Sequence, residues 1–193
     1  MSGRPREFDE QAVLETAMDV FWEQGYEATG IAELSERCGI GRQSMYNAFG
    51  DKKALFDQAL ERYQRERIGH LVALLERPGS PLGNIDALLG MWEANWASQD
   101  GRGCLMVNTM AEMGDRDPET RSKLDRMVQT IEDGLYRTLR RAQEAGELPA
   151  ESDPRALART ITITFQGLAV VGKVSSSPTY ARDVLGTVRA LLN

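Results

Sequence analysis

Apolar residues recur at intervals of three and four positions along most of the chain, which is the spacing of helices that bury one face. Val13, Ala17 and Phe21, for example, share one face of such a helix. Runs of this kind are bounded by glycine, proline and aspartate. They predict about nine helices, over residues 10–24, 30–37, 42–49, 52–75, 82–97, 104–113, 118–145, 154–174 and 178–192. The pattern therefore predicts an all-α fold.

Residues that favour helix starts precede several of these segments. Asp9 and Asp51 stand where an N-cap side chain accepts backbone hydrogen bonds, and we expect Thr29 to cap the short helix after it. Asp-Pro pairs at 117–118 and 153–154 place proline at the first helical position, where its missing N–H costs nothing. These signals predict where five of the helices begin.

One stretch resembles a strand. Residues 160–165 alternate between threonine and apolar side chains, which is the period of a half-buried β-strand. The stretch follows the start signal at 153–154 and continues without a break to residue 174. Because β-branched residues are tolerated in helices buried by packing, we expect a helix here.

Two short predicted helices, 30–37 and 42–49, are joined by a tight turn at Gly39-Ile40-Gly41. A preceding helix with this pair makes a helix-turn-helix unit, whose second helix enters the DNA major groove. The sequence thus predicts an N-terminal three-helix helix-turn-helix domain over residues 1–50, followed by a C-terminal helical bundle over residues 51–193.

The distribution of charge is compatible with sequence-specific DNA binding but not with non-specific coating of DNA. The chain of 193 residues has 41% hydrophobic and 27% charged residues and a net charge of −6, which is typical of a globular protein and argues against a non-specific DNA coat. Within residues 1–53, six basic residues stand against ten acidic ones. The bases lie at the N-terminal arm, at Arg37, at Arg42 and at residues 52–53, so the face presumed to meet DNA is basic or neutral.

Chemistry-bearing residues are scarce. Two cysteines far apart and a single histidine argue against a disulfide framework, a metal site or acid–base catalysis, and we expect neither a cofactor nor an enzyme. No run approaches the roughly 18 apolar residues of a membrane helix, and no secretory signal is visible. The prediction is a cytoplasmic protein without a membrane partner.

A resemblance to a known family is carried by residues 8–56. The most specific motif is residues 44–52, Ser-Met-Tyr-Asn-Ala-Phe-Gly-Asp-Lys, in the pattern small–apolar–Tyr–x–x–Phe–x–x–Lys. Residues 17–21, 25–29, 31–34 and 38–41 match as well. This part of the chain resembles the DNA-binding domain of the TetR family of transcriptional regulators.

The resemblance implies roles at individual positions of the DNA-binding domain. Phosphate contacts are implied for Thr29, Ser44, Tyr46 and Lys52, and base contacts for Arg42, Gln43 and Asn47. Arginine pairs with guanine, and glutamine or asparagine with adenine, so the residue types suit base reading. Arg4 and Arg6, on the N-terminal arm, are expected to reach a minor groove or a phosphate.

The second half is expected to form the regulatory and dimerisation body. Family members usually pair through their last two helices. The segment 154–174 carries apolar residues on more than one side, and the segment 178–192 adds further apolar residues. A twofold protein also matches a palindromic operator. The alternative is that these faces only complete the core of one protomer.

A ligand pocket is expected among helices of this body. Met and aromatic side chains suit adaptable apolar sites. The candidate lining residues are Met91, Trp92, Trp96, Met106, Met110, Met113, Tyr136, Phe165 and Gln166, with His70, Asn108 and Glu112 as polar groups that would orient a ligand. The alternative is that the same residues form an ordinary core.

Cys104 stands at a predicted helix start, two residues after Arg102. Both features favour a thiolate, and the surrounding residues resemble family members that sense electrophiles or oxidants through a cysteine there. The hypothesis is a redox sensor; the alternative is a small buried apolar residue.

The function expected from the resemblance is a sequence-specific DNA-binding transcriptional repressor. A small-molecule, electrophile or oxidant effector would release it from a palindromic operator. The alternative is a helical small-molecule-binding or protein-interaction module without a DNA function.

Overall fold

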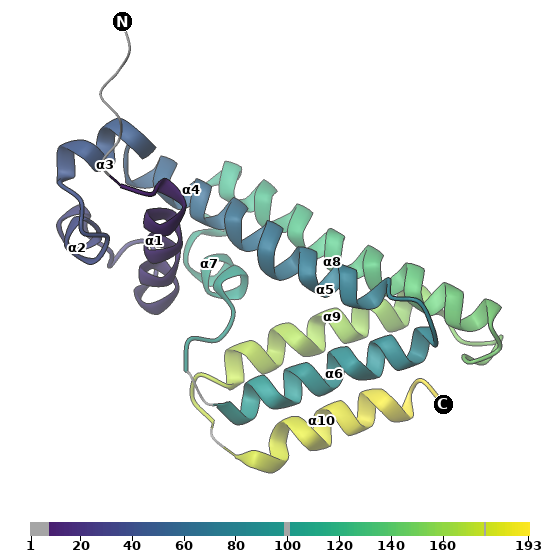
Figure 1. The fold of residues 1–193 in the computed structure, drawn as a ribbon. Coiled ribbons are helices and arrows are strands. Elements are labelled where there is room, and N and C mark those ends of the chain that lie inside the picture. Colours follow the sequence, from purple (N-terminus) through teal and green to yellow (C-terminus); the bar gives the residue numbers. More distant parts are fainter. Residues whose placement is uncertain (1–7, 99–100, 176) are drawn as a thin grey trace, which may run out of the picture.

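The computed structural model describes residues 8–98, 101–175 and 177–193 (Figure 1). The elements, in chain order, are α1 (Glu10–Gln24), α2 (Ile31–Arg37), α3 (Arg42–Phe49), α4 (Lys52–Tyr63), the π-helical segment η1 (Gln64–Ile68), α5 (Gly69–Leu75), α6 (Pro81–Ser98), α7 (Leu105–Met113), α8 (Pro118–Glu144), α9 (Pro154–Val171) and α10 (Pro178–Ala190). The described residues contain helices and no strand, which confirms the all-α prediction. The strand-like residues 160–165 lie inside α9.

The fourth predicted helix, residues 52–75, is interrupted by a π-helical turn. α4, η1 and α5 follow one another without a loop, so the described part of the chain forms nine continuous helical rods, as expected. A π-helical turn accommodates an extra residue in the backbone hydrogen-bond ladder, and such turns are frequent at functional sites. Apolar spacing does not reveal it, because Leu60, Tyr63, Ile68 and Leu71 all remain buried on either side.

Aspartate side chains cap four of the five helices whose starts were predicted from capping signals. The side chains of Asp9, Asp51, Asp117 and Asp153 each accept a hydrogen bond from a backbone N–H in the first turn of the helix that follows. The prediction for Thr29 is wrong: α2 begins at Ile31, its N-cap is Gly30, and no side chain caps it.

The first four helices share a small apolar core. Phe21 of α1 meets Phe56 of α4 edge to face, with the ring centroids 4.9 Å apart. Leu34 of α2 and Met45 of α3 are fully buried in the same cluster. This core holds α2 and α3 against α1 and α4, and it therefore sets the orientation of α3.

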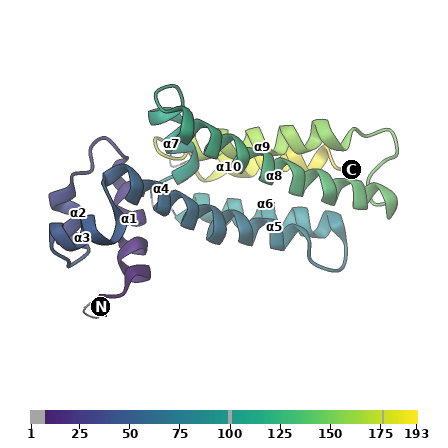
Figure 2. The same ribbon diagram turned by 90° about the horizontal axis from the view of Figure 1, so that it is seen from above.

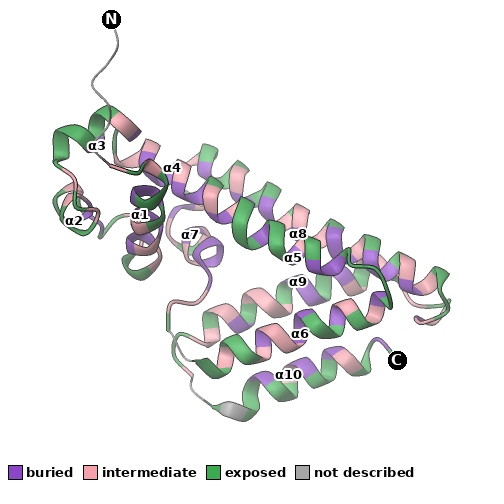
Figure 3. Cartoon of the chain, viewed as in Figure 1, coloured by how far each residue is buried: buried purple, intermediate pink, exposed green. Residues whose placement is uncertain are grey.

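The remaining helices form an elongated body. α8 packs against α5, α6 and α9, and α6 also packs against α5 and α10. Figure 1 shows α5 and α8 running side by side, while α9, α6 and α10 form a second group, and Figure 2 shows α1, α2 and α3 gathered at one end of the molecule. Buried positions concentrate where the helices face one another (Figure 3). In the part of the chain that the structure describes, no helix is long and apolar enough to span a bilayer.

Candidate DNA-binding face and candidate effector cavity

The turn between α2 and α3 presents α3 at the surface. Gly39 adopts a left-handed backbone conformation, with φ of +66°, and the N–H of Ile40 bonds to the carbonyl of Ser35. A residue with a Cβ atom is strained at this φ, so glycine suits the turn. Met45 and Phe49 of α3 point into the core. The opposite side of α3 is consequently free to meet a partner.

The five candidate residues of α3 all lie on this exposed side. They are Arg42, Gln43, Ser44, Tyr46 and Asn47. The amide of Gln43 donates to the Oδ1 of Asn47 over 3.0 Å, so these two side chains lie together one helical turn apart. Tyr46 is 46% exposed although it is aromatic. An exposed tyrosine beside polar side chains fits a contact surface better than a core.

Thr29 and Lys52 lie differently from the other candidates. Thr29 is buried, and its hydroxyl donates to the Gly25 carbonyl over 2.6 Å, so in this conformation it offers no hydroxyl to a phosphate. The ammonium group of Lys52 donates to the carbonyls of Tyr26 and Thr29, over 2.9 and 3.1 Å, and lies 4.2 Å from the centre of the Tyr26 ring. Both side chains stabilise the connection between α1 and α2. Arg4 and Arg6 lie outside the described residues.

Glu112 of α7 binds the same connection from the other side. Its carboxylate accepts hydrogen bonds from the backbone N–H groups of Tyr26 and Glu27, over 2.9 and 2.7 Å. Gly25 permits this approach, since a Cβ atom there would lie 2.8 Å from the carboxylate. Glu112 was predicted to orient a ligand; the structure instead places it between the body and the DNA-binding helices.

A second set of contacts joins α1 to the loop before α7. The indole N–H of Trp22 donates to the carbonyl of Gly103 over 3.2 Å, and Arg102 pairs with Asp19 over 3.1 Å. Gly103 has φ of +65° and lies so close to the Ala169 carbonyl that a Cβ atom would collide with it. The loop before α7 thus touches both α1 and α9.

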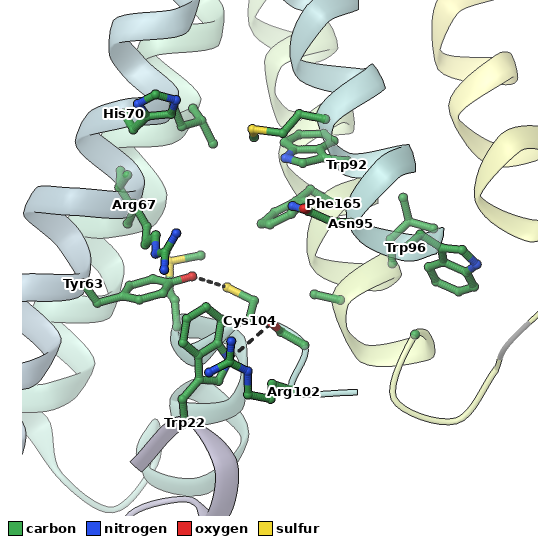
Figure 4. A pocket seen from close by; sticks show the side chains of 18 of the residues that line it. Trp22, Tyr63, Arg67, His70, Trp92, Asn95, Trp96, Arg102, Cys104 and Phe165 are labelled. Atoms are coloured by element: carbon green, nitrogen blue, oxygen red, sulfur yellow. Dashed lines mark hydrogen bonds between the residues drawn. The ribbon is translucent and has the colours of Figure 1, made fainter. Parts of the chain in front are cut away.

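The body contains a cavity of about 700 Å³ (Figure 4). Its walls come from α1, α4, η1, α5, α6, α8, α9, the loop before α7 and the start of α7. Five predicted residues line it, namely Met91, Trp92, Trp96, Met106 and Phe165, together with His70. Trp92 and Phe165 stack with their ring centroids 4.3 Å apart. The cavity suits a ligand of drug-like size.

Four predicted ligand contacts lie outside the cavity. Met110 and Met113 pack in the core, Tyr136 lies under the guanidinium of Arg155, and Gln166 does not reach the cavity wall. Asn108 also lies elsewhere and bonds to Lys173 and the Arg102 carbonyl. Helical spacing placed these residues on apolar faces, but it does not say which face meets the cavity.

Trp22, Tyr63 and Arg67 line the cavity and were not predicted to do so. They come from α1, α4 and η1, far from α6 in the sequence. From the sequence, the two aromatic residues are typical of core packing and the arginine is typical of an exposed surface. No local signal therefore identified them as cavity residues.

Cys104 is buried beside the hydroxyl of Tyr63, with 3.1 Å between Oη and Sγ (Figure 4). Burial raises the pKa of the Cys104 thiol, and this effect exceeds the lowering by Tyr63 and the backbone N–H groups at the start of α7. The expected low pKa is therefore wrong, because Arg102 lies over the Trp22 ring and pairs with Asp19 rather than with the thiol. Burial also raises the pKa of Cys38.

Exposed apolar side chains gather on α9. Ile163, Val170 and Val174, just past its end, are 67%, 54% and 89% exposed, while Ile161 and Leu168 on the other side are buried. α10 adds Tyr180, which is 43% exposed. Large exposed apolar groups aligned along a helix are typical of a surface that another protein covers.

Comparisons with known proteins agree with this geometry. Residues 13–59 match a family model described as bacterial regulatory proteins, tetR family, and residues 81–188 match the tetracyclin repressor-like C-terminal domain. The uncharacterized HTH-type transcriptional regulator YezE of Bacillus subtilis is 34% identical over 94% of each chain. The HTH-type transcriptional repressor ComR of Escherichia coli is 28% identical over 98% of this chain and 91% of its own.

A solved structure adds a DNA complex. A cysteine mutant of the TetR family regulator CifR, complexed with 26-bp double-strand operator DNA, is 31% identical, with a TM-score of 0.81 over 98% of both chains. All these relatives are transcriptional regulators, which confirms the prediction that the chain is not an enzyme. The chain belongs to the TetR family of helix-turn-helix transcriptional regulators.

Proposed function

We propose that the protein is a homodimeric repressor that binds a palindromic operator and releases it when an effector occupies the cavity. One observation carries the DNA contact: the first turns of α3 present five polar or aromatic side chains outward from a buried helix-turn-helix core. Relatives named as repressors, such as ComR, and the operator complex of CifR support the same role. We place the protein in the cytoplasm, where operator DNA is accessible.

Arg42, Gln43 and Asn47 are the proposed base-reading residues, and Ser44 and Tyr46 are the proposed phosphate contacts. The planar guanidinium and amide groups suit bidentate bonds to base edges. Lys52 already donates to two carbonyls, so its third N–H is the one that remains for a phosphate. Arg4 and Arg6 remain proposed contacts of the N-terminal arm.

Dimerisation is proposed through α9 and α10, at the exposed side chains of Ile163, Val170 and Val174. A protomer that covers these side chains on its partner removes apolar surface from water. We assign residues 1–50 to DNA binding and residues 51–193 to effector binding and dimerisation. α4 packs against α1 and continues into the body, so it connects the two functions.

Two helices are proposed to carry the effector signal. α4 ends at Tyr63 in the cavity wall. Cys104, the N-cap of α7, lies in the same wall, and α7 reaches the connection between α1 and α2 through Glu112. We expect α4 and α7 to occupy different positions in the operator-bound and the effector-bound conformations. An effector that binds the second conformation more tightly lowers operator affinity by the ratio of its affinities for the two conformations. Attack of the Cys104 thiolate on an electrophile that enters the cavity, after the thiol has lost its proton to solvent, is the second candidate trigger, because Cys104 lines the cavity.

The decisive experiment is selection of genomic fragments by the purified protein, followed by sequencing. We expect an enriched palindrome that Tyr46→Ala loses and that Arg42→Ala recognises with one relaxed base-pair position. Arg77→Ala, an exposed position on the loop after α5, is the matched control and should enrich the same palindrome. Equal enrichment of a palindrome by the wild type and Tyr46→Ala would remove Tyr46 from the proposed DNA contacts. No enrichment by the wild type, even at low salt, would favour a helical module without a DNA function.

A further inference from the structure

The cavity is lined by two arginines and one glutamate, and these side chains differ in whether an opposite charge lies beside them. Arg67, Arg102 and Glu66 line it. Glu66 pairs with Arg62 over 3.0 Å, and Arg102 pairs with Asp19 over 3.1 Å. Each of these two groups therefore already has an opposite charge beside it.

Arg67 is different. Among the described residues no carboxylate lies within 4 Å of its guanidinium, whose one recorded ring contact is Trp22, with 5.8 Å to the ring centre. Arg67 is exposed overall, and Figure 4 shows its side chain reaching toward Tyr63 at the cavity. Its charge lowers the pKa of Tyr63, although burial and Cys104 hold that pKa well above its ordinary value. Arg67 thus brings an uncompensated positive charge to the cavity.

A guanidinium selects particular ligands. Its N–H groups form a planar fork that matches the two oxygens of a carboxylate, and such paired bonds are among the strongest that proteins make. Arg67 and Arg102 together disfavour a cationic ligand. His70, three residues after Arg67, also lines this side of the cavity and adds a further polar group.

Aromatic and methionine side chains elsewhere in the cavity lining determine which ligand shape fits. Trp92 and Phe165 stack almost parallel, with 26° between the ring planes, and Met91 and Met106 lie in the same lining. Flat aromatic walls and thioether side chains favour a planar apolar body. A ligand that satisfies both walls has a carboxylate at one end and a planar apolar group at the other.

We propose that the effector is an organic carboxylate with a planar apolar body, held by Arg67 at its charged end and by Trp92 and Phe165 along its rings. The role of this ligand as an effector rests on the proposed function. Binding of such an anion to the cavity does not depend on it.

Calorimetric titration of the full-length, reduced protein tests the proposal. The probes are benzoate, cinnamate and 1-naphthaleneacetate, each paired with its neutral primary amide. We expect at least one of the acids to bind, and its amide to bind at least tenfold more weakly, because the charge-assisted bonds to Arg67 are lost. Arg67→Gln should reduce the affinity for the acid to about that for the amide.

Arg65→Gln is the matched control, since Arg65 is exposed two residues away and does not line the cavity. It should leave the affinity for the acid unchanged. Equal affinity for acid and amide, an equal loss in both variants, or no binding of any acid would each overturn the proposal. Operator binding measured by anisotropy without probes keeps the two hypotheses apart: retained operator binding with no acid bound refutes the effector class alone, and acid binding without operator binding refutes the proposed function alone.

Discussion

The carboxylate of Glu112 accepts a hydrogen bond from the backbone N–H of Tyr26 across the boundary between the body and the DNA-binding helices, over 2.9 Å. The adjacent N–H, of Glu27, bonds to the other oxygen. One side chain of α7 thus satisfies two neighbouring N–H groups in the connection between α1 and α2. Because α7 begins in the cavity wall, this contact is a direct mechanical link from the cavity to the DNA-binding domain.

Replacement of Glu112 by alanine should release this connection. Two charge-assisted bonds are lost, so we expect the free energy of unfolding to fall by about 1–3 kcal/mol and the amides of Tyr26 and Glu27 to exchange faster with deuterium. Exchange measured by mass spectrometry on peptides from this region checks the local effect. Glu151→Ala, an exposed carboxylate, should leave exchange there unchanged. Unchanged protection in Glu112→Ala would contradict the link.

The Cys104 thiol should react slowly at neutral pH. Burial raises its pKa, and only the thiolate is a nucleophile, so the rate of alkylation by iodoacetamide should keep rising beyond pH 9, the ordinary value. The measurement uses a Cys38→Ser background, so that Cys104 is the one reactive cysteine. Tyr63→Phe removes a hydrogen bond that lowers this pKa and should slow alkylation further. An alkylation rate that levels off below pH 8 would show that the thiol has a low pKa and would support the hypothesis that Cys104 is a reactive sensor.

Asp117 joins α8 to α4. It accepts from the Thr120 hydroxyl over 2.6 Å and pairs with Lys53 over 3.0 Å, and the two contacts lower its pKa to about 2. A lowered carboxyl pKa contributes stability that is present above the unfolded value near 4 and is lost as pH falls toward 2.

Asp117→Asn keeps an N-cap side chain but removes the charge. After allowance for solvent screening, we expect a loss of about 1 kcal/mol at pH 7, which shrinks as pH falls below 4. Urea unfolding of both proteins across this range measures the difference. Asp115→Asn, which removes an exposed charge two residues away, should have no comparable effect. A difference that does not depend on pH would assign the loss to packing instead of charge.

Val170 lies in the middle of the exposed apolar row on α9. A glutamate at this position places a charge in the proposed dimer contact, so Val170→Glu should shift the protein from dimer to monomer in light scattering, while its helical circular dichroism is retained. Ala94→Glu, at an exposed position of α6, should remain a dimer. A dimeric Val170→Glu protein would place the protomer contact elsewhere.

The helices could be predicted from the sequence because helix capping and apolar spacing depend on residues only a few positions apart. Asp9, Asp51, Asp117 and Asp153 each cap the helix that directly follows, and apolar spacing identifies which side of a helix is buried whatever covers it. The outward residues of α3 were predictable for the same reason, since Met45 and Phe49 face the core and the polar residues before and between them must then face away.

The residues that line the cavity, and the contacts that join it to the DNA-binding helices, could be identified only from the tertiary structure. Arg67, Trp22 and Trp92 meet there although they are far apart in the sequence, and no spacing rule relates them. Cys104 shows the difference most directly. Its position at a helix start favours a thiolate, but packing against Tyr63 removes it from water, and the cost of burying a charge exceeds the effect of the helix.

The sequence by itself determined the family, the helices and the face of α3, because each depends on a motif or on neighbours within a few residues. Only the tertiary structure decided that Thr29 turns inward, that Glu112 binds the connection between α1 and α2, and that Arg67 of the π-helical segment lines the cavity. These outcomes depend on which distant surfaces pack together, and packing sets burial, hydrogen-bond partners and charge pairing at the same time.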